Sequence, residues 1–262
     1  MRILRLTGLM IFVLLVGTAH AKVVTRPVSY TQGGTALEGF LAYDDAVKGK
    51  APGVLVVHEW WGLNDYARSR ARQLAQLGYV AFAVDMYGKG KATRHPDQAA
   101  AWMKAVNSNM DAWRKRAQAG LDVLRKQPQV DPGRIAAIGY CFGGATVQVL
   151  AYSGANLKGI VSFHGSLVPP SEEQAKRTKA KFLICHGAKD PLNPPQALLA
   201  YVNALNASSI DWQLIVFGNT RHGFTNPDAG KYGMAALAYS PSSDRRSWQY
   251  MKYFFQEIFA EK

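Results

Sequence analysis

The sequence predicts an α/β protein with a mostly parallel central sheet and helices on both faces. Short apolar runs rich in β-branched residues recur along the chain, as in strands that are buried on both sides: residues 54–57, 80–84, 135–138, 159–163, 182–185 and 212–217. Most intervals between these runs have the apolar spacing of helices. Such alternation is typical of parallel sheets with right-handed crossovers, so we expect this architecture.

The helices expected between the strands follow in chain order. Apolar residues recur at steps of three and four in residues 65–77, 99–124, 144–152 and 195–205. Near the end, Ser240 suits an N-cap and Pro241 suits the first helical position. A long C-terminal helix is expected from the apolar residues that follow at steps of three and four: Trp248, Met251, Phe255 and Ile258.

The domain organisation is expected to be simple. The polar segment 169–181 is interpreted as a surface excursion, and no internal repeat or Pro-, Gly- or Ser-rich linker divides the chain. A chain of this length can bury most of its apolar surface in one core. Residues 22–262 are therefore expected to form a single domain.

The first 21 residues are typical of a cleavable signal peptide. Arg2 and Arg5 precede an apolar run at 9–16, and small residues surround a cleavage point at 19–21. An uncleaved membrane anchor is the alternative, but the run falls short of the roughly 20 residues that cross a bilayer. We expect a mature chain that starts near Lys22, is periplasmic or secreted, and keeps no stable membrane anchor.

The formal net charge of +13 raises the question of an anionic partner. The basic residues are scattered, and no nucleic-acid-binding motif accompanies them, so we expect a solvated basic surface rather than a nucleic-acid interface. Acidic envelope components or anionic small molecules remain possible partners. The two cysteines, Cys141 and Cys185, are too few for a disulfide framework. Cys185 lies in an apolar run and is expected to be a small buried hydrophobic residue.

Cys141 lies between an apolar strand and the start of a helix, with Gly139 and Gly143 two positions away on either side. This is the pattern of a nucleophile elbow with Cys in place of Ser, in which a sharp turn leaves no room for flanking side chains. The helix N-terminus is expected to stabilise a thiolate there. A glycine-rich turn whose Cys only packs is the alternative. A phosphate-binding loop is disfavoured because the segment lacks the Lys-Ser/Thr ending.

Two further residues suit a catalytic set in the order nucleophile, acid, histidine. Asp190 follows the strand at 182–185, and His222 follows the strand at 212–217. Both would lie at the carboxyl edge of the sheet with Cys141, where His222 could take the thiol proton and Asp190 could orient the imidazole. Taken singly, Asp190 could be a turn former and His222 a loop residue. His164 and His186 also follow strands and are expected to be hydrogen-bonded supporting residues, with no metal-ligand spacing among the histidines.

The segment after the first central strand, 58–64, lies where a hydrolase contributes its second oxyanion donor. We expect the backbone N–H groups of Trp60 and Phe142 to form this hole. Glu59 would then stand near Cys141, although a charge at the N-terminus of the next helix is the alternative interpretation.

With these motifs in place, the chain resembles the dienelactone hydrolase family, which has the α/β-hydrolase fold. The matching segments span nearly the whole mature chain in order: 58–64, 85–88, 139–144, 186–191 and 222–224. The resemblance implies a triad of Cys141, His222 and Asp190, with Glu59 interacting with the thiol before substrate engages. It implies attack on an ester or lactone carbonyl, an acyl-thioester intermediate and hydrolysis by water, without a cofactor.

The substrate pocket departs from the family's pattern. Where the resemblance implies arginines that hold a substrate carboxylate, this chain has Lys89 and Asn226, and Arg221 lies next to the histidine. Lys lacks the planar fork of Arg, and Asn adds no charge. A mostly apolar pocket is expected from aromatic residues, whose alternative role is packing: Trp60, Trp61, Tyr87 and Phe224.

The expected activity is hydrolysis of small ester or lactone substrates. Two other interpretations stay open. One is a non-catalytic protein that binds a carboxylate or aromatic ligand on the same scaffold. The other is a redox-sensitive thiol at Cys141 in an oxidising compartment.

Overall fold

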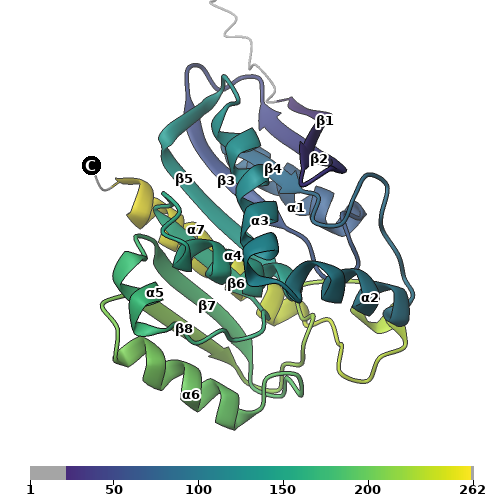
Figure 1. Cartoon of the computed structure of the whole chain (residues 1–262), viewed down its shortest axis with the longest axis vertical. Coiled ribbons are helices and arrows are strands. Elements are labelled where there is room, and N and C mark those ends of the chain that lie inside the picture. The colour runs from purple at the N-terminus through teal and green to yellow at the C-terminus, as the bar shows by residue number, and fades with distance from the viewer. Residues whose placement is uncertain (1–21, 261–262) are drawn as a thin grey trace, which may run out of the picture.

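The computed structural model describes residues 22–260. The predicted signal peptide, at 1–21, lies outside the described residues. The described chain folds around a single eight-stranded sheet, with the strands in the order β1-β2-β4-β3-β5-β6-β7-β8 (Figure 1). The strands have these bounds: β1 Val23–Gln32, β2 Thr35–Asp44, β3 Ala51–Val57, β4 Val80–Val84, β5 Val130–Tyr140, β6 Gly159–Phe163, β7 Lys181–Gly187 and β8 Trp212–Phe217.

The strands from β3 onward pair in parallel with one another, and β4 also pairs antiparallel with β2. The mostly parallel sheet agrees with the architecture that the sequence predicts. Their carboxyl ends therefore meet at one edge of the sheet. The helices have these bounds: α1 Asp65–Gln76, α2 Pro96–Asn107, α3 Met110–Arg125, α4 Phe142–Tyr152, α5 Glu172–Arg177, α6 Pro195–Asn206 and α7 Pro241–Ala260, with a 3₁₀ turn η1 at Ala229–Tyr232.

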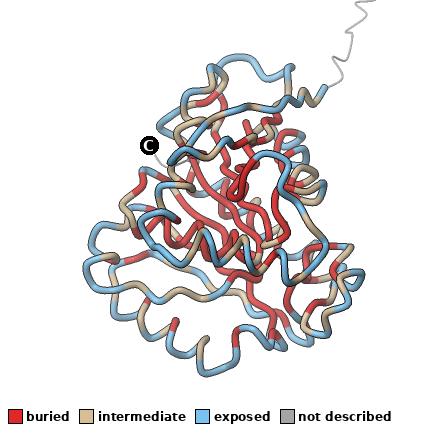
Figure 2. Tube along the Cα trace, turned by 45° about the vertical axis from the view of Figure 1, so that its right-hand side comes forward, coloured by how far each residue is buried: buried red, intermediate tan, exposed pale blue. Residues whose placement is uncertain are grey.

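Two hydrophobic layers cover the sheet. On one face, side chains such as Leu55 and Val57 pack with residues of α3, α4 and α6. On the other face, Val54 and Val56 pack with residues of α1 and α7. Successive side chains of a strand point to opposite faces, so one apolar run fills both layers. The central strands are accordingly buried along their length, as Figure 2 shows in red.

Ser240 begins α7 as expected, since its Oγ accepts a hydrogen bond from the N–H of Ser243. Two other features differ from the prediction. An antiparallel hairpin, β1–β2, precedes the parallel core and was not predicted; its turn uses Gly33 and Gly34, both at positive φ. The helical stretch 99–124 is two helices, because Asn109 caps a new helix through the N–H of Ala112.

A third feature adds detail to the surface excursion predicted at 169–181, most of which is exposed. It contains the short helix α5, whose capping box pairs Ser171 with Gln174. Glu173 and Arg177 form an ion pair one turn apart on its exposed side. The short polar sequence carries too few apolar residues to show a helical period, which is why the capping residues are its clearest signal.

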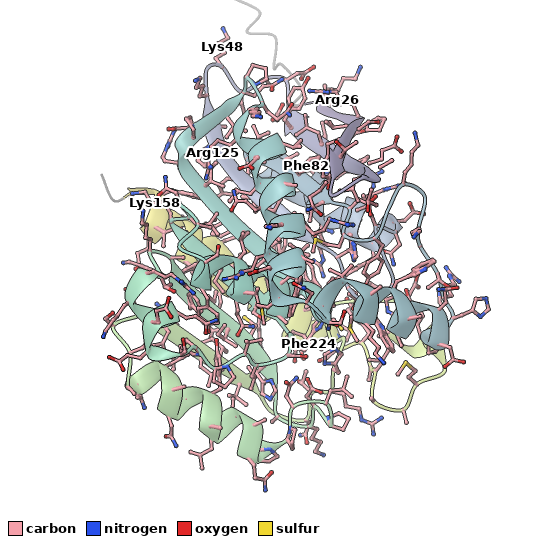
Figure 3. The ribbon with its side chains drawn as sticks, viewed as in Figure 1. Arg26, Lys48, Phe82, Arg125, Lys158 and Phe224 are labelled. Atoms are coloured by element: carbon pink, nitrogen blue, oxygen red, sulfur yellow. The ribbon has the colours of Figure 1, made fainter. Side chains whose placement is uncertain are left out.

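Basic side chains of the described chain come from several different elements: Arg26 from β1, Lys48 from the segment between β2 and β3, and Arg125 from the end of α3, all labelled in Figure 3. Within residues 22–260, no helix is both long enough and apolar enough to cross a membrane.

Candidate active site

Cys141 occupies a strained turn between β5 and α4. Its backbone has φ 54° and ψ −116°, a conformation that side-chain-bearing residues rarely adopt. The turn leaves no space at the flanking glycines: a Cβ on Gly139 would lie 2.0 Å from the carbonyl oxygen of Gly143, and one on Gly143 would lie 2.2 Å from that of Val57. Glycine is therefore required at both positions. The turn presents the partly exposed Cys141 at the carboxyl edge of the sheet.

Asp190 and His222 meet at the same edge. Nδ1 of His222 and Oδ2 of Asp190 are 2.8 Å apart, and both side chains are buried. The other contacts of Asp190 are an N–H from Leu192 and the amide nitrogen of Asn193. Burial alone would raise the pKa of Asp190, but these hydrogen bonds and the charge of His222 lower it to about 2. Asp190 is thus an ionised acceptor that fixes the orientation of the imidazole.

The second ring nitrogen of His222, Nε2, is buried, and among the described residues only the Cys141 side chain interacts with the imidazole from that side. Burial disfavours protonation of this ring. A thiolate at Cys141 and the contact with Asp190 outweigh burial, and together they raise the pKa of His222 to about 10. The ring therefore lies within electrostatic reach of Cys141, with a nitrogen free to exchange a proton with a bound group.

Glu59 is held beside these groups by Asn226. The Nδ2 group of Asn226 donates to Oε2 of Glu59 at 2.6 Å, while Oδ1 of Asn226 accepts the N–H of Asp228. Burial raises the pKa of Glu59 to about 7, although Asn226 and the positive charges of His222 and Arg70 act in the opposite direction. Since α1 begins at Asp65, Glu59 lies outside its first turn, and the helix-charge interpretation does not hold.

The backbone N–H groups of Trp60 and Phe142 donate no hydrogen bond to any residue of the described chain. Phe142 is the first residue of α4, where an N–H has no partner within the helix. Two unengaged donors on the segments that flank Cys141 suit an oxyanion hole.

The residues expected to contact substrate have different environments. Tyr87 is buried, and its hydroxyl has no hydrogen-bond partner within residues 22–260. Trp61 stacks on Tyr232 with ring centroids 4.0 Å apart, and Phe224 packs against His164. Both Trp61 and Phe224 are fully buried and present almost no surface to a ligand in this conformation. For Trp61 and Phe224, the structure therefore favours packing, the alternative role considered for these aromatic residues, over contact with substrate.

The two basic side chains near the pocket are engaged elsewhere. The ammonium of Lys89 forms an ion pair with Glu38 at 2.8 Å, so a substrate carboxylate would have to compete with that pair. Arg221 donates to the carbonyl oxygen of Ala235. Asn226, which takes the place of an expected arginine, is committed to Glu59.

His164 and His186 lie behind the site. Nε2 of His164 is 2.7 Å from Oγ1 of Thr225, and its ring meets that of His222 edge-on at 5.1 Å, so it supports the site as expected. Burial, and then the charge of His222, hold the pKa of His164 well below its usual range. Nδ1 of His186 has no hydrogen-bond partner in the described chain, which contradicts the expectation of a hydrogen-bonded residue.

Cys185 is fully buried, as expected, and burial raises the pKa of its thiol. Sequence reasoning missed Arg70, which is buried behind the site and forms hydrogen bonds with the carbonyl oxygen of Thr225 and with Asp244. The sequence signal that could have identified Arg70 is its place on the apolar face of a predicted helix. Among residues 22–260, no three His, Cys, Asp or Glu side chains come together as a metal site would require.

A thiol on a strained strand-to-helix turn, beside a buried Asp–His pair at the edge of a parallel sheet, defines an enzyme of the α/β-hydrolase fold. The chain belongs to the dienelactone hydrolase family, because residues 37–259 match the sequence profile of that family. The resemblance seen in the motifs is thereby confirmed, and the protein is a carboxylic ester or lactone hydrolase.

Similar proteins cover nearly the whole chain. A dienelactone hydrolase-like promiscuous phosphotriesterase, P91, from metagenomic libraries is 42% identical with a TM-score of 0.87 and covers 90% of this chain and 99% of its own. The structure titled m3DLH is 45% identical, with the same TM-score and coverage. A curated relative described as a putative carboxymethylenebutenolidase, from Yersinia pestis, is 26% identical over 86% of this chain and 85% of its own length.

Proposed function

We propose that this protein cleaves small carboxylic esters or lactones with Cys141 as the nucleophile, through an acyl-thioester intermediate. The observation that supports this most strongly is the placement of Cys141. It lies on a positive-φ turn and interacts with His222, whose Nδ1 is held by Asp190 and whose Nε2 is not engaged by any other described residue. This set of contacts suits an activated thiol and a base that can pass a proton.

In the first half of the reaction, the Cys141 thiolate attacks the carbonyl carbon, and the electron pair of the C=O bond moves to oxygen. The N–H groups of Trp60 and Phe142 stabilise this oxyanion. The tetrahedral species then collapses and expels the alcohol oxygen, which takes a proton from His222 in the imidazolium form that its raised pKa of about 10 favours. In the second half, His222 takes a proton from water and the hydroxide attacks the thioester carbonyl. The tetrahedral species expels the Cys141 thiolate and frees the acid, and the thiolate regains its proton from Glu59.

Glu59 has a separate role in this proposal. Its carboxylate is held by Asn226 within electrostatic reach of His222. We propose that it accepts the thiol proton of Cys141 when substrate enters, so that the thiolate forms only when it is needed. Its pKa of about 7, raised by burial, makes the carboxyl group able to both take and return a proton near neutral pH. Asn226 keeps the acid in place without supplying a compensating charge.

A second substrate class is favoured by one comparison. P91, which is 42% identical, is described as a promiscuous phosphotriesterase. Attack of the Cys141 sulfur on a phosphotriester phosphorus would use the same oxyanion donors and the same His222 proton transfer. We therefore propose weak phosphotriester hydrolysis beside the main ester activity.

The test measures the rates at which matched variants hydrolyse p-nitrophenyl acetate and a p-nitrophenyl phosphotriester. Cys141→Ala should lower both rates at least about 10³-fold, because the nucleophile is lost. Cys185→Ala, which removes the other thiol from the core, should leave both rates nearly unchanged in folded protein. Ester hydrolysis that survives Cys141→Ala would contradict the proposal.

A further inference from the structure

His58 is a fully buried histidine that the proposed mechanism does not use. It follows β3 directly and precedes Glu59 and Trp60, so it belongs to the segment that carries one of the proposed oxyanion donors. Its ring packs edge-on against Tyr87 with centroids 4.9 Å apart, and it lies 6.2 Å from the ring of Phe142, the residue of the other donor.

Both nitrogens of His58 have a backbone partner. Nε2 lies 3.2 Å from the N–H of Met86, and because an N–H can only donate, Nε2 must be the unprotonated nitrogen. Nδ1 therefore carries the proton and donates it to the carbonyl oxygen of Glu59 at 2.5 Å. Burial lowers the pKa of His58, which keeps the ring neutral and preserves this tautomer.

The bond to the Glu59 carbonyl has a geometric consequence for Trp60. The C=O of Glu59 and the N–H of Trp60 belong to the same planar peptide unit. In the described chain no peptide bond is cis, so these two groups point in opposite directions. The same carbonyl oxygen also accepts the N–H of Gly62, but at a longer 3.3 Å, so His58 is its closer partner. Holding the carbonyl toward the His58 ring turns the Trp60 N–H away from that ring, and the contact with Met86 fixes the ring just beyond the end of β4.

We propose that His58 is a positioning residue that aims the Trp60 N–H at the oxygen of the bound substrate. This inference rests on the proposed function, because it assigns the Trp60 N–H to the oxyanion. His58 touches neither Cys141 nor the reacting atoms through any hydrogen bond, so it acts only through the peptide between Glu59 and Trp60. The other donor, Phe142, is placed independently by the start of α4.

Three substitutions separate the two hydrogen bonds. The amide nitrogen of His58→Asn can take the place of Nδ1 and donate to Glu59, whereas the amide oxygen of His58→Gln can take the place of Nε2 and accept from Met86. His58→Phe fills the space but forms neither bond. Steady-state kinetics with p-nitrophenyl acetate, thermal unfolding and the rate of Cys141 alkylation by iodoacetamide are measured for each variant and for Cys141→Ala.

We expect His58→Phe to lower kcat about 10²-fold with KM changed less than about threefold, since a misdirected donor is lost in the transition state. His58→Asn should recover kcat to within about tenfold of wild type, and His58→Gln should recover less. Alkylation of Cys141 should stay within about threefold in all three variants, because the thiol and His222 are not disturbed.

A folded His58→Phe with wild-type kcat would overturn the inference. If that variant does not fold, equal losses of kcat in His58→Asn and His58→Gln would overturn it, as would alkylation rates that fall in parallel with kcat. Failure of the proposed function is recognised separately, because Cys141→Ala would then keep its ester hydrolysis whatever the His58 variants do.

Discussion

At the residue scale, burial and neighbouring charges together set the protonation of Glu59 and His222. Glu59 and His222 are both buried, yet their pKa values move by different causes: burial raises that of Glu59 to about 7, while a Cys141 thiolate and Asp190 raise that of His222 to about 10 against the effect of burial. The two groups therefore exchange protons over different pH ranges, and each can be isolated by substitution.

Glu59 makes folding stability depend on pH. Its folded pKa is above its unfolded value of 4.5, so its protonated form favours folding, and that contribution is lost as pH rises from about 4.5 through about 7. Glu59→Gln should remove this loss. Between pH 4 and pH 8, the free energy of unfolding of the variant should rise by about 3 kcal/mol relative to that of the wild type, as measured by urea unfolding. A difference between the two proteins that does not change with pH would contradict the assignment.

The same group should shape the activity profile. If the Glu59 carboxylate accepts the thiol proton, kcat/KM should rise as pH increases through about 7, and Glu59→Gln should flatten this limb. Stopped assays with p-nitrophenyl acetate from pH 5 to pH 8.5 measure kcat/KM for the wild type and for Glu59→Gln. A Glu59→Gln profile that retains the wild-type inflection would assign the limb to another group.

The turn at Cys141 gives a third residue-scale prediction. In Gly143→Ala the new methyl group would lie 2.2 Å from the carbonyl oxygen of Val57, so the elbow must shift. We expect about 2 kcal/mol lower stability and loss of most ester hydrolysis. Gly230→Ala is the matched control, because its Cβ would meet nothing within 4 Å. Stability and ester hydrolysis are measured for both variants by denaturant unfolding and ester assays. Equal values for Gly143→Ala and Gly230→Ala would contradict the steric account.

At the element scale, a buried ion pair joins α1 to α7. Arg70 on α1 and Asp244 on α7 lie 2.5 Å apart with little exposure, and Arg70 also donates to the carbonyl oxygen of Thr225. Thr225 in turn contacts His164, whose ring lies against His222. The packing of two helices on one face of the sheet is thus connected to the loop that carries His222.

Removing one partner of this pair should cost more than removing both. Asp244→Ala leaves a buried guanidinium uncompensated, and we expect about 3 kcal/mol of lost stability. Arg70→Met combined with Asp244→Ala should recover part of that loss. Urea unfolding of the two single variants and the double variant measures the coupling, and strictly additive losses would show that the pair contributes no interaction energy.

The sequence predicted some elements and not others for physical reasons. The parallel strands stand out because both faces are buried, which makes them continuous apolar runs. The edge strand β1 is half exposed, so its sequence lacks the continuous apolar run by which the buried strands are recognised. Asp190 and His222 were predictable because they follow strands, whereas Asn226 and His58 act through contacts with segments distant in the chain, at Glu59 and Met86.

At the scale of the whole molecule, we propose that the protein is exported. The sequence of residues 1–21 supports it, and the net charge of +13 suits a basic protein facing acidic envelope components. When the full chain is expressed in a Gram-negative bacterium, we expect the periplasmic or secreted fraction to contain protein that starts near Lys22. Intact mass and N-terminal sequencing measure this, and an uncleaved cytoplasmic chain would contradict export.

The central claim is that Cys141 carries the acyl group during turnover. The most direct measurement is rapid acid quenching of the enzyme with p-nitrophenyl acetate, followed by intact-mass and peptide analysis. The account predicts a single acetyl group on the peptide that contains Cys141, absent in Cys141→Ala and present in Cys185→Ala. Hydrolysis at the wild-type rate by Cys141→Ala, or an acetyl group on another residue during turnover, would contradict it.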